Sequence, residues 1–218
     1  MRYKAFLLDW DGTIIDSLLL KLENAGNLFA ARYGVNSAAA QICYRRYSGI
    51  PRRQLFDRIA LDLLERRLAD EEFDRLSSEF TELNLKVLRT RAQLKSEARA
   101  TLTTLRSRGV IACISTSVPA TELELLVSHF QLQPLLHELL GSRPGFGKGP
   151  EHAAFVAEKY QLQLAEIAGV GDEPRDIELH HAATIGSIGI TGTETRQELL
   201  ACGANIVIDR LDELINYV

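Results

Sequence analysis

Two aspartates separated by one residue follow an apolar run near the start of the chain. Residues 6–8 (Phe-Leu-Leu) precede Asp9 and Asp11, and a short apolar run of this kind is typical of a strand buried on both faces. Alternate side chains of an extended segment share a face, so both carboxylates would enter one cavity. Their mutual repulsion favours a bound divalent cation or a shared proton. The spacing indicates a reaction centre, with a solvated turn as the simpler alternative.

Two later segments offer groups that could hold an anion. Ser115 and Thr116 follow the apolar run 110–114, and a hydroxyl with free main-chain amides at a strand end can bind an anionic oxygen. An ordinary helix cap is the alternative. Lys148 lies in the glycine-rich stretch 145–149 just before a predicted helix. It could bring a positive charge to a phosphate, or it could be a solvated loop lysine.

A second pair of acids follows the apolar run 167–170. Pro174 suits the first turn of a helix, so Asp172 is predicted at a strand end and Asp176 one turn into the helix. Acidic residues at a helix start also interact favourably with the helix dipole, which is the alternative explanation.

The elements that must position these residues alternate between helix and strand after residue 96. Predicted helices cover 96–108, 123–130 and 150–160 and two further segments, one from 174 and one around 199; predicted strands cover 110–114, 135–140, 167–170, 185–190 and 206–208. This alternation predicts an α/β fold with a Rossmann-like, mostly parallel sheet and helices on both faces.

The segment between the first motif and this alternation is helical throughout. A helix is expected over 18–33 with its end at Gly34, and apolar stripes indicate helices over 55–64 and 73–87, the latter behind an Asp70 cap. We therefore expect an inserted all-helical cap domain at 18–90. The catalytic core domain would combine 1–17 with 91–218.

Composition narrows the range of partners. The chain has 218 residues, 46% of them hydrophobic, and a formal net charge of -4. Because the chain has no excess of basic residues, we expect no nucleic-acid partner. Because it has no long apolar segment, we expect no membrane partner and a cytoplasmic location. The three cysteines lack metal-ligand spacing and are expected to be reduced thiols. The five histidines also lack ligand spacing and are given no catalytic role. The oligomeric state stays open.

In order and spacing, these motifs resemble the haloacid dehalogenase superfamily, in its phosphatase branch with a helical cap after the first motif. The family's motifs are matched by Asp9, Asp11 and Thr13, then by Ser115, Lys148, Gly171, Asp172 and Asp176. Asp16-Ser17 after the first motif, and residues 49–52 in the cap, are similar to the phosphoglycolate phosphatase-like branch.

The resemblance implies an Mg²⁺-dependent phosphatase that hydrolyses a small phosphomonoester through an aspartyl-phosphate. Asp9 would be the nucleophile and Asp11 the general acid and base. Mg²⁺ would be held by the carboxylates of Asp9 and Asp172 and by the main-chain carbonyl of Asp11. The groups expected to bind phosphate are Ser115, Thr116 and Lys148; Thr13 and Asp176 would support the metal site without touching the ion.

The cap would exclude water and contact the rest of the substrate, with Tyr47, Arg52 and Arg53 as candidates for specificity. Two alternatives stay open. A phosphomutase of the beta-phosphoglucomutase type would use the same scaffold but return the phosphoryl group to a sugar hydroxyl. A catalytically silent phosphate-binding or signalling protein would bind without turnover.

Overall fold

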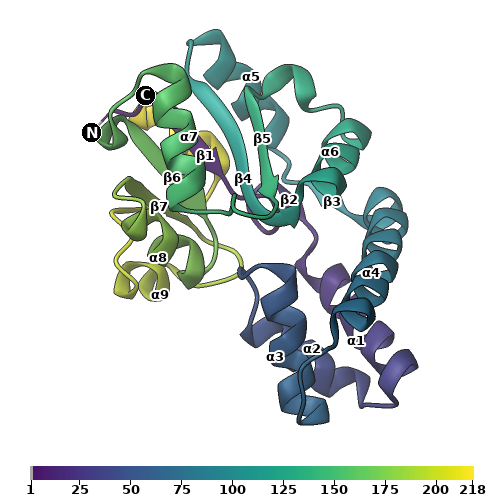
Figure 1. Ribbon diagram of the computed structural model, residues 1–218. Coiled ribbons are helices and arrows are strands. Elements are labelled where there is room, and N and C mark those ends of the chain that lie inside the picture. Colours follow the sequence, from purple (N-terminus) through teal and green to yellow (C-terminus); the bar gives the residue numbers. More distant parts are fainter. Residues whose placement is uncertain (1) are drawn as a thin grey trace. The chain divides into compact units, whose positions relative to one another are not determined.

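The computed structural model describes residues 2–218 and divides the chain into two compact units (Figure 1). One unit contains the described residues up to Asp16 together with Gln93–Val218, and the other is Ser17–Ala92. The first unit is an α/β structure built on a parallel sheet, and the second is formed by helices. The predicted fold class is confirmed.

Six strands form the sheet in the order β5-β4-β1-β6-β7-β8, and every neighbouring pair is parallel. They are β1 (Ala5–Leu8), β4 (Ile111–Pro119), β5 (Glu138–Ser142), β6 (Ile167–Gly171), β7 (Gly186–Ile190) and β8 (Ile206–Ile208). The chain builds outward from β1 through β4 and β5, and then continues on the other side of β1 with β6. Ligand sites of open α/β sheets form at such a switch point, outside the carboxyl ends of the strands.

Helices cover the sheet because both of its faces are apolar. They are α5 (Ala98–Ser107), α6 (Ala120–His129), α7 (Pro150–Tyr160), α8 (Pro174–Ala182) and α9 (Arg196–Ala201), with 3₁₀ turns η1 (Gln133–Leu135), η2 (Leu164–Glu166) and η3 (Leu211–Tyr217). Ala5 and Leu7 of β1 belong to one core cluster with Val156 of α7. Phe6 and Leu8 alternate with them and are also fully buried, so the opposite face is covered too.

A two-stranded ribbon joins the two ends of the helical insertion. β2 (Ile15–Asp16) pairs antiparallel with β3 (Gln93–Leu94), with Asp16 opposite Gln93. The Lys95 Nζ atom lies 2.6 Å from an Asp16 carboxylate oxygen and extends this pairing. The sequence pattern did not predict the ribbon, because two residues are too few to show a period of two.

The helical unit consists of α1 (Leu18–Tyr33), α2 (Ser37–Arg46), α3 (Arg52–Leu64) and α4 (Asp70–Arg91). Its core centres on Phe56, whose ring packs edge-to-face on Phe29 and on Phe80 with centroids 5.4 and 5.3 Å apart. Such aromatic pairs contribute about 0.5–1.5 kcal/mol each beyond their buried area. α1 ends at Gly34, which adopts the left-handed conformation that glycine tolerates (φ 68°).

Two local predictions were wrong. Asp70 is not the cap of α4: it is the first helical residue, and the main-chain N–H of Ala69 donates to the Glu72 carboxylate instead (3.3 Å). The strand predicted at 135–140 begins only at Glu138, after the 3₁₀ turn Gln133–Leu135. Pro134 lies in that turn, where its fixed φ suits a helical conformation and its missing N–H does no harm.

Within residues 2–218, no helix combines the length and the apolarity that crossing a bilayer requires.

Candidate active site

Strand register brings the first candidate residues together. Leu8 of β1 pairs with Ile114 of β4 on one side and with Val170 of β6 on the other. The residues that follow them, Asp9, Ser115 and Gly171, therefore lie side by side toward the carboxyl ends of these strands. The main-chain N–H of Asp9 still donates to the carbonyl of Val170 (2.8 Å), which fixes Asp9 against β6.

Residues of the turn after β1 pack directly against the side chain of Asp172. Thr13 Oγ1 donates to Asp172 Oδ1 over 3.1 Å, and both side chains are buried. Gly12 has φ +76°, and a Cβ on this residue would lie 2.1 Å from Asp172 Oδ2. The first and the last predicted motifs therefore meet here, and position 12 requires glycine for two reasons, backbone conformation and space.

Lys148 connects two of the acids. Its Nζ atom lies 2.7 Å from Asp9 Oδ1 and 2.5 Å from Asp176 Oδ1, and its side chain is only 6% exposed. Asp176 is held in place by the main-chain N–H of Glu173, which donates to its second carboxylate oxygen (3.1 Å). Lys148 lies two residues after a turn that is closed by two main-chain hydrogen bonds between Arg143 and Phe146.

Burial controls the electrostatics of these groups. It raises the pKa of Asp9 above the ordinary carboxylate range; the Lys148 ammonium opposes that shift, and neighbouring aspartates add to it. Burial also raises the pKa of Asp172, with Asp176 adding to the shift. At Asp176 burial favours the neutral acid, but the contact with Lys148 outweighs it and holds the pKa below its usual value. Burial disfavours the charged Lys148, but Asp176 and Asp9 outweigh it and raise its pKa.

Asp9, Asp172 and Asp176 can hold a divalent metal ion. Each places one carboxylate oxygen so that the three atoms lie within 4.8 Å of one another, and all three side chains are buried. Three acids face one lysine, and a bound cation would offset the burial and the neighbouring negative charges that raise the pKa values of Asp9 and Asp172. Carboxylate oxygens are hard ligands of the kind that Mg²⁺ and Ca²⁺ bind.

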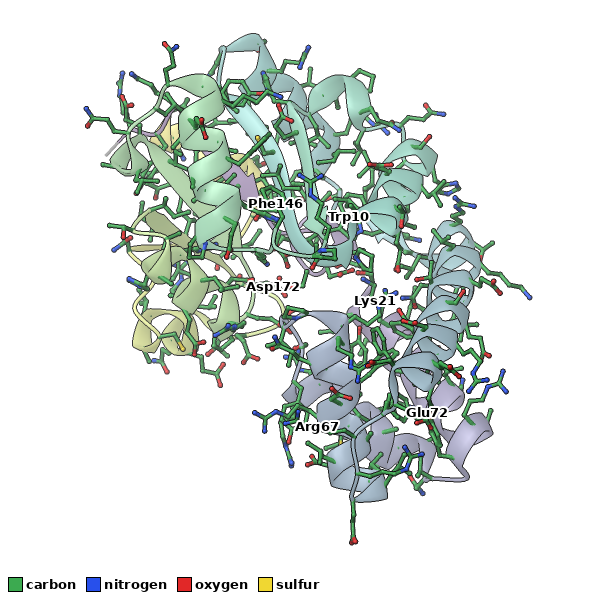
Figure 2. All side chains as sticks on the ribbon, viewed as in Figure 1. Trp10, Lys21, Arg67, Glu72, Phe146 and Asp172 are labelled. Atoms are coloured by element: carbon green, nitrogen blue, oxygen red, sulfur yellow. The ribbon has the colours of Figure 1, made fainter. Side chains whose placement is uncertain are left out.

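The three-carboxylate cluster differs in membership from the predicted ligand set. Asp176, predicted only to support the site, contributes a carboxylate oxygen to the cluster. Asp11 is half-buried, and its negative charge is one of those that raise the pKa of Asp9. Trp10, between Asp9 and Asp11, is fully buried and packs near Phe130, with ring centroids 6.2 Å apart. Figure 2 labels Trp10 and Asp172, both in the α/β unit.

The hydroxyl segment lies within β4, because the strand predicted to end at Ile114 continues to Pro119. The regular pairing of β4 with β5 runs to Ser115, where the register becomes irregular. Ser115 and Thr116 are both buried; Thr116 Oγ1 accepts a hydrogen bond from the main-chain N–H of Val118 (3.3 Å). Ser115 Oγ lies 2.9 Å from Nδ1 of His152, a partner that the sequence analysis missed.

The three specificity candidates lie in the helical unit, where each has contacts of its own. Tyr47 donates from its hydroxyl to Asp62 (2.9 Å). Arg52 donates to Thr81 Oγ1 (2.6 Å). Arg53 donates to the main-chain carbonyl of Leu68 (2.8 Å) and forms ion pairs with two aspartates. Their part in substrate recognition stays a prediction.

The chain belongs to the haloacid dehalogenase-like hydrolases, since the model of that family matches residues 3–183. It is therefore an enzyme of a hydrolase family, and the predicted family resemblance is confirmed. Phosphoglycolate phosphatase from Mannheimia succiniciproducens is 26% identical over 87% of this chain and 86% of its own length. Phosphoglycolate phosphatase from Haemophilus influenzae is 24% identical with the same coverage.

Solved structures share the fold over nearly the whole chain. The crystal structure of a predicted phosphoglycolate phosphatase from Haemophilus somnus has a TM-score of 0.83 at 21% identity and covers 99% of this chain and 98% of its own. A candidate beta-phosphoglucomutase from Bacteroides vulgatus has a TM-score of 0.78 at 20% identity, covering 99% of this chain and 87% of its own. At these identities the likeness concerns the fold.

Proposed function

We propose that this protein is an Mg²⁺-dependent phosphatase that hydrolyses a small phosphomonoester through an aspartyl-phosphate. The observation that carries the proposal is the contact between Lys148 and Asp9, 2.7 Å apart in a buried cluster with two further aspartates. The Lys148 ammonium opposes the effect of burial on the pKa of Asp9 and so favours the ionised carboxylate, which is the form that attacks phosphorus. Family membership and the names of the relatives point to the same chemistry.

In the first step, an Asp9 carboxylate oxygen forms a bond to phosphorus while the bond from phosphorus to the ester oxygen breaks. Asp11 gives a proton to that leaving oxygen, and the alcohol departs. In the second step Asp11 takes a proton from water as the water oxygen attacks phosphorus. The bond between phosphorus and Asp9 breaks, inorganic phosphate leaves, and both aspartates return to their starting states.

Other residues would hold the phosphoryl group during both steps. The Ser115 hydroxyl, the main-chain amide of Thr116 and the Lys148 ammonium are suited to its oxygens. Asp9, Asp172 and Asp176 offer carboxylate oxygens for Mg²⁺, and the main-chain carbonyl of Asp11 is a further candidate ligand. Bound there, Mg²⁺ would supply positive charge against the repulsion between the phosphate dianion and the Asp9 carboxylate.

We propose the helical unit as the cap, with residues 17–92 following the unit boundary rather than the expected 18–90. Tyr47, Arg52 and Arg53 remain its candidates for specificity. A cytoplasmic enzyme acting on a soluble small phosphate ester fits the composition, and phosphoglycolate is a first substrate to test because the relatives named above are phosphoglycolate phosphatases.

A phosphate-release assay tests this proposal. The protein is incubated with phosphoglycolate, p-nitrophenyl phosphate and sugar phosphates, with Mg²⁺ or with a chelator. We expect release that needs Mg²⁺ and falls by about 10³-fold or more in Asp9→Asn. Asp209→Asn is the matched control, since Asp209 is a surface acid of the same unit with its side chain 60% exposed.

The covalent step and the mutase alternative have their own readouts. Acid-quenched wild-type protein should carry one added phosphoryl group by mass, and Asp9→Asn should carry none. Full turnover in chelator, or wild-type rates in Asp9→Asn, would contradict the proposal. Isomerised sugar phosphate without phosphate release would indicate the phosphomutase, and binding without turnover would indicate the silent binding protein.

A further inference from the structure

Ser115 and His152 form a buried pair, and the proposed chemistry uses only its serine. Ser115 Oγ lies 2.9 Å from His152 Nδ1. The serine is 3% exposed and the histidine 0%. They are far apart in the sequence, one in β4 and the other in the first turn of α7. A buried pair of this kind fixes the direction of the serine hydroxyl, because solvent cannot compete for either atom.

The surroundings of His152 keep its ring neutral and fixed. Burial, together with the positive charges of Lys148 and Arg143, lowers the pKa of His152 to about 3. The ring packs against Phe146, with centroids 4.6 Å apart. The Arg143 guanidinium lies over the same Phe146 ring, 4.4 Å from its centroid. His152 is therefore one neutral tautomer in one orientation.

The unpartnered ring nitrogen indicates which tautomer this is. Within residues 2–218, His152 Nε2 is buried and has no hydrogen-bond partner. A neutral imidazole carries its hydrogen on one nitrogen only. A hydrogen on Nε2 would leave a buried N–H without an acceptor, which is rare in native structures, whereas a bare Nε2 leaves only an unused lone pair. The hydrogen therefore belongs on Nδ1, where Ser115 Oγ accepts it.

This tautomer determines what Ser115 can do. When Nδ1 donates to Oγ, the hydroxyl hydrogen is left free to point elsewhere; in the other tautomer the hydroxyl would donate to the ring and could not donate to an anion. Ser115 lies beside Asp9, because Leu8 and Ile114, the residues before them, are paired, and the Asp9 carboxylate contacts Lys148. The free hydrogen is therefore available to an oxygen of a phosphoryl group bound at Asp9.

We propose that His152 is a positioning residue that donates from Nδ1 to Ser115 and so reserves the serine hydroxyl hydrogen for a phosphoryl oxygen. The phosphoryl ligand in this inference rests on the proposed function. The tautomer of His152 and its hydrogen bond to Ser115 do not depend on that function. It assigns a role within the site to a histidine that has no metal-ligand spacing.

A spectrum of the folded protein tests the tautomer without any turnover. Long-range ¹H–¹⁵N correlations of ¹⁵N-histidine-labelled protein distinguish hydrogens on Nδ1 and Nε2, and His152→Asn identifies the signals of position 152. We expect the Nδ1–H form at neutral pH. The Nε2–H form would overturn the proposal, even in a protein that hydrolyses every ester offered, and a missing phosphatase activity would leave this result standing.

Three variants separate positioning from packing, with p-nitrophenyl phosphate and phosphoglycolate as substrates. His152→Leu keeps apolar bulk without a donor, and His152→Asn keeps an N–H donor near the Nδ1 position with less bulk. We expect kcat/KM to fall about tenfold in His152→Leu and less in His152→Asn. His129→Leu, at an exposed position of the same unit, is the control. A packing role would reverse the order of Leu and Asn and would overturn the proposal.

A double-mutant cycle with Ser115→Ala tests whether His152 acts through the serine. We expect Ser115→Ala with His152→Leu to be no slower than Ser115→Ala alone, since the hydroxyl that His152 orients is already gone. Losses that multiply in the double variant would show that His152 acts independently of Ser115 and would overturn the proposal. Thermal unfolding of each variant checks that it is folded at the temperature at which the rates are compared.

Discussion

The Nζ atom of Lys148 lies 2.7 Å from the Oδ1 atom of Asp9, in a site where the two side chains are 6% and 11% exposed. Lys148 is also the partner of Asp176, so one ammonium group balances two buried carboxylates. Removal of one partner of a buried ion pair leaves a charge without compensation, which costs more than the pair itself contributes.

The first prediction concerns this lysine. Lys148→Met keeps the chain length but removes the charge, so we expect the free energy of unfolding to fall by about 3–5 kcal/mol and phosphate release to be lost. Urea unfolding measures the first effect. Lys159→Met is the control: Lys159 pairs with Glu138 but is 48% exposed, and such pairs contribute about 0–1 kcal/mol. Equal losses in the two variants would contradict the prediction.

The second prediction concerns the hydrogen bond from Thr13 to Asp172. Thr13→Val preserves the shape and removes the donor, so the Asp172 carboxylate loses the group that orients it. We expect Mg²⁺ affinity, measured from the metal dependence of phosphate release, to fall about 10–100-fold. Thr103→Val, on the exposed surface of α5, should leave metal affinity unchanged. An unchanged affinity in Thr13→Val would count against Asp172 as a metal ligand.

The third prediction uses two glycines with the same backbone and different surroundings. Gly12 and Gly109 have φ +76° and +72°, but a Cβ at Gly12 would meet Asp172 at 2.1 Å and one at Gly109 would meet nothing within 4 Å. Gly109→Ala should cost about 1–2 kcal/mol of stability through backbone strain alone. Gly12→Ala should cost more and should also abolish turnover, because Asp172 must move. Equal activity in the two variants would show that Asp172 tolerates displacement.

The fourth prediction is a pH dependence of stability. His152 has a pKa of about 3 in the folded protein against an ordinary value of 6.5, so between these values the unfolded chain binds a proton that the folded protein does not. The free energy of unfolding therefore falls as the pH is lowered through this window, by at most about 1.4 kcal/mol per pH unit. Above the ordinary histidine pKa, neither state binds the proton, and His152 adds no pH dependence.

Urea unfolding of wild type and His152→Leu measures this term by difference. The stability advantage of wild type over the variant should shrink by about 2 kcal/mol between about pH 7 and pH 5. The buried aspartates with raised pKa values act in the opposite direction, but they are present in both proteins and largely cancel. Parallel pH curves would show that His152 is not buried as a neutral ring.

Local patterns predicted most of the elements, and long-range contacts account for what they missed. The helices Leu18–Tyr33 and Pro150–Tyr160 match their predicted bounds because a terminal glycine or an initial proline marks the ends. The motif residues Asp9 and Asp172 were correctly placed after the ends of neighbouring strands, whereas the strand predicted to end before Ser115 continues to Pro119. Parallel pairing alone brings such ends to one edge, so this part of the site could be predicted.

The pair of Ser115 and His152 could not be predicted, because their contact depends on how α7 packs against the sheet. A weaker signal was present: His152 and Val156 are four residues apart on one helix face, and Val156 is buried. That spacing indicates a buried histidine, although it does not identify its partner. The same limit explains why Asp176 was not assigned to the carboxylate cluster.

The ribbon of β2 and β3 makes the helical insertion a separable module. Asp16 and Gln93 face each other in antiparallel register, so the core chain leaves and re-enters at neighbouring points. A tight hairpin turn could join these two positions directly, since antiparallel strands need only about two residues to connect them. The α/β unit could thus be expressed with the insertion excised, or with a different one grafted in, without rerouting any strand of its sheet.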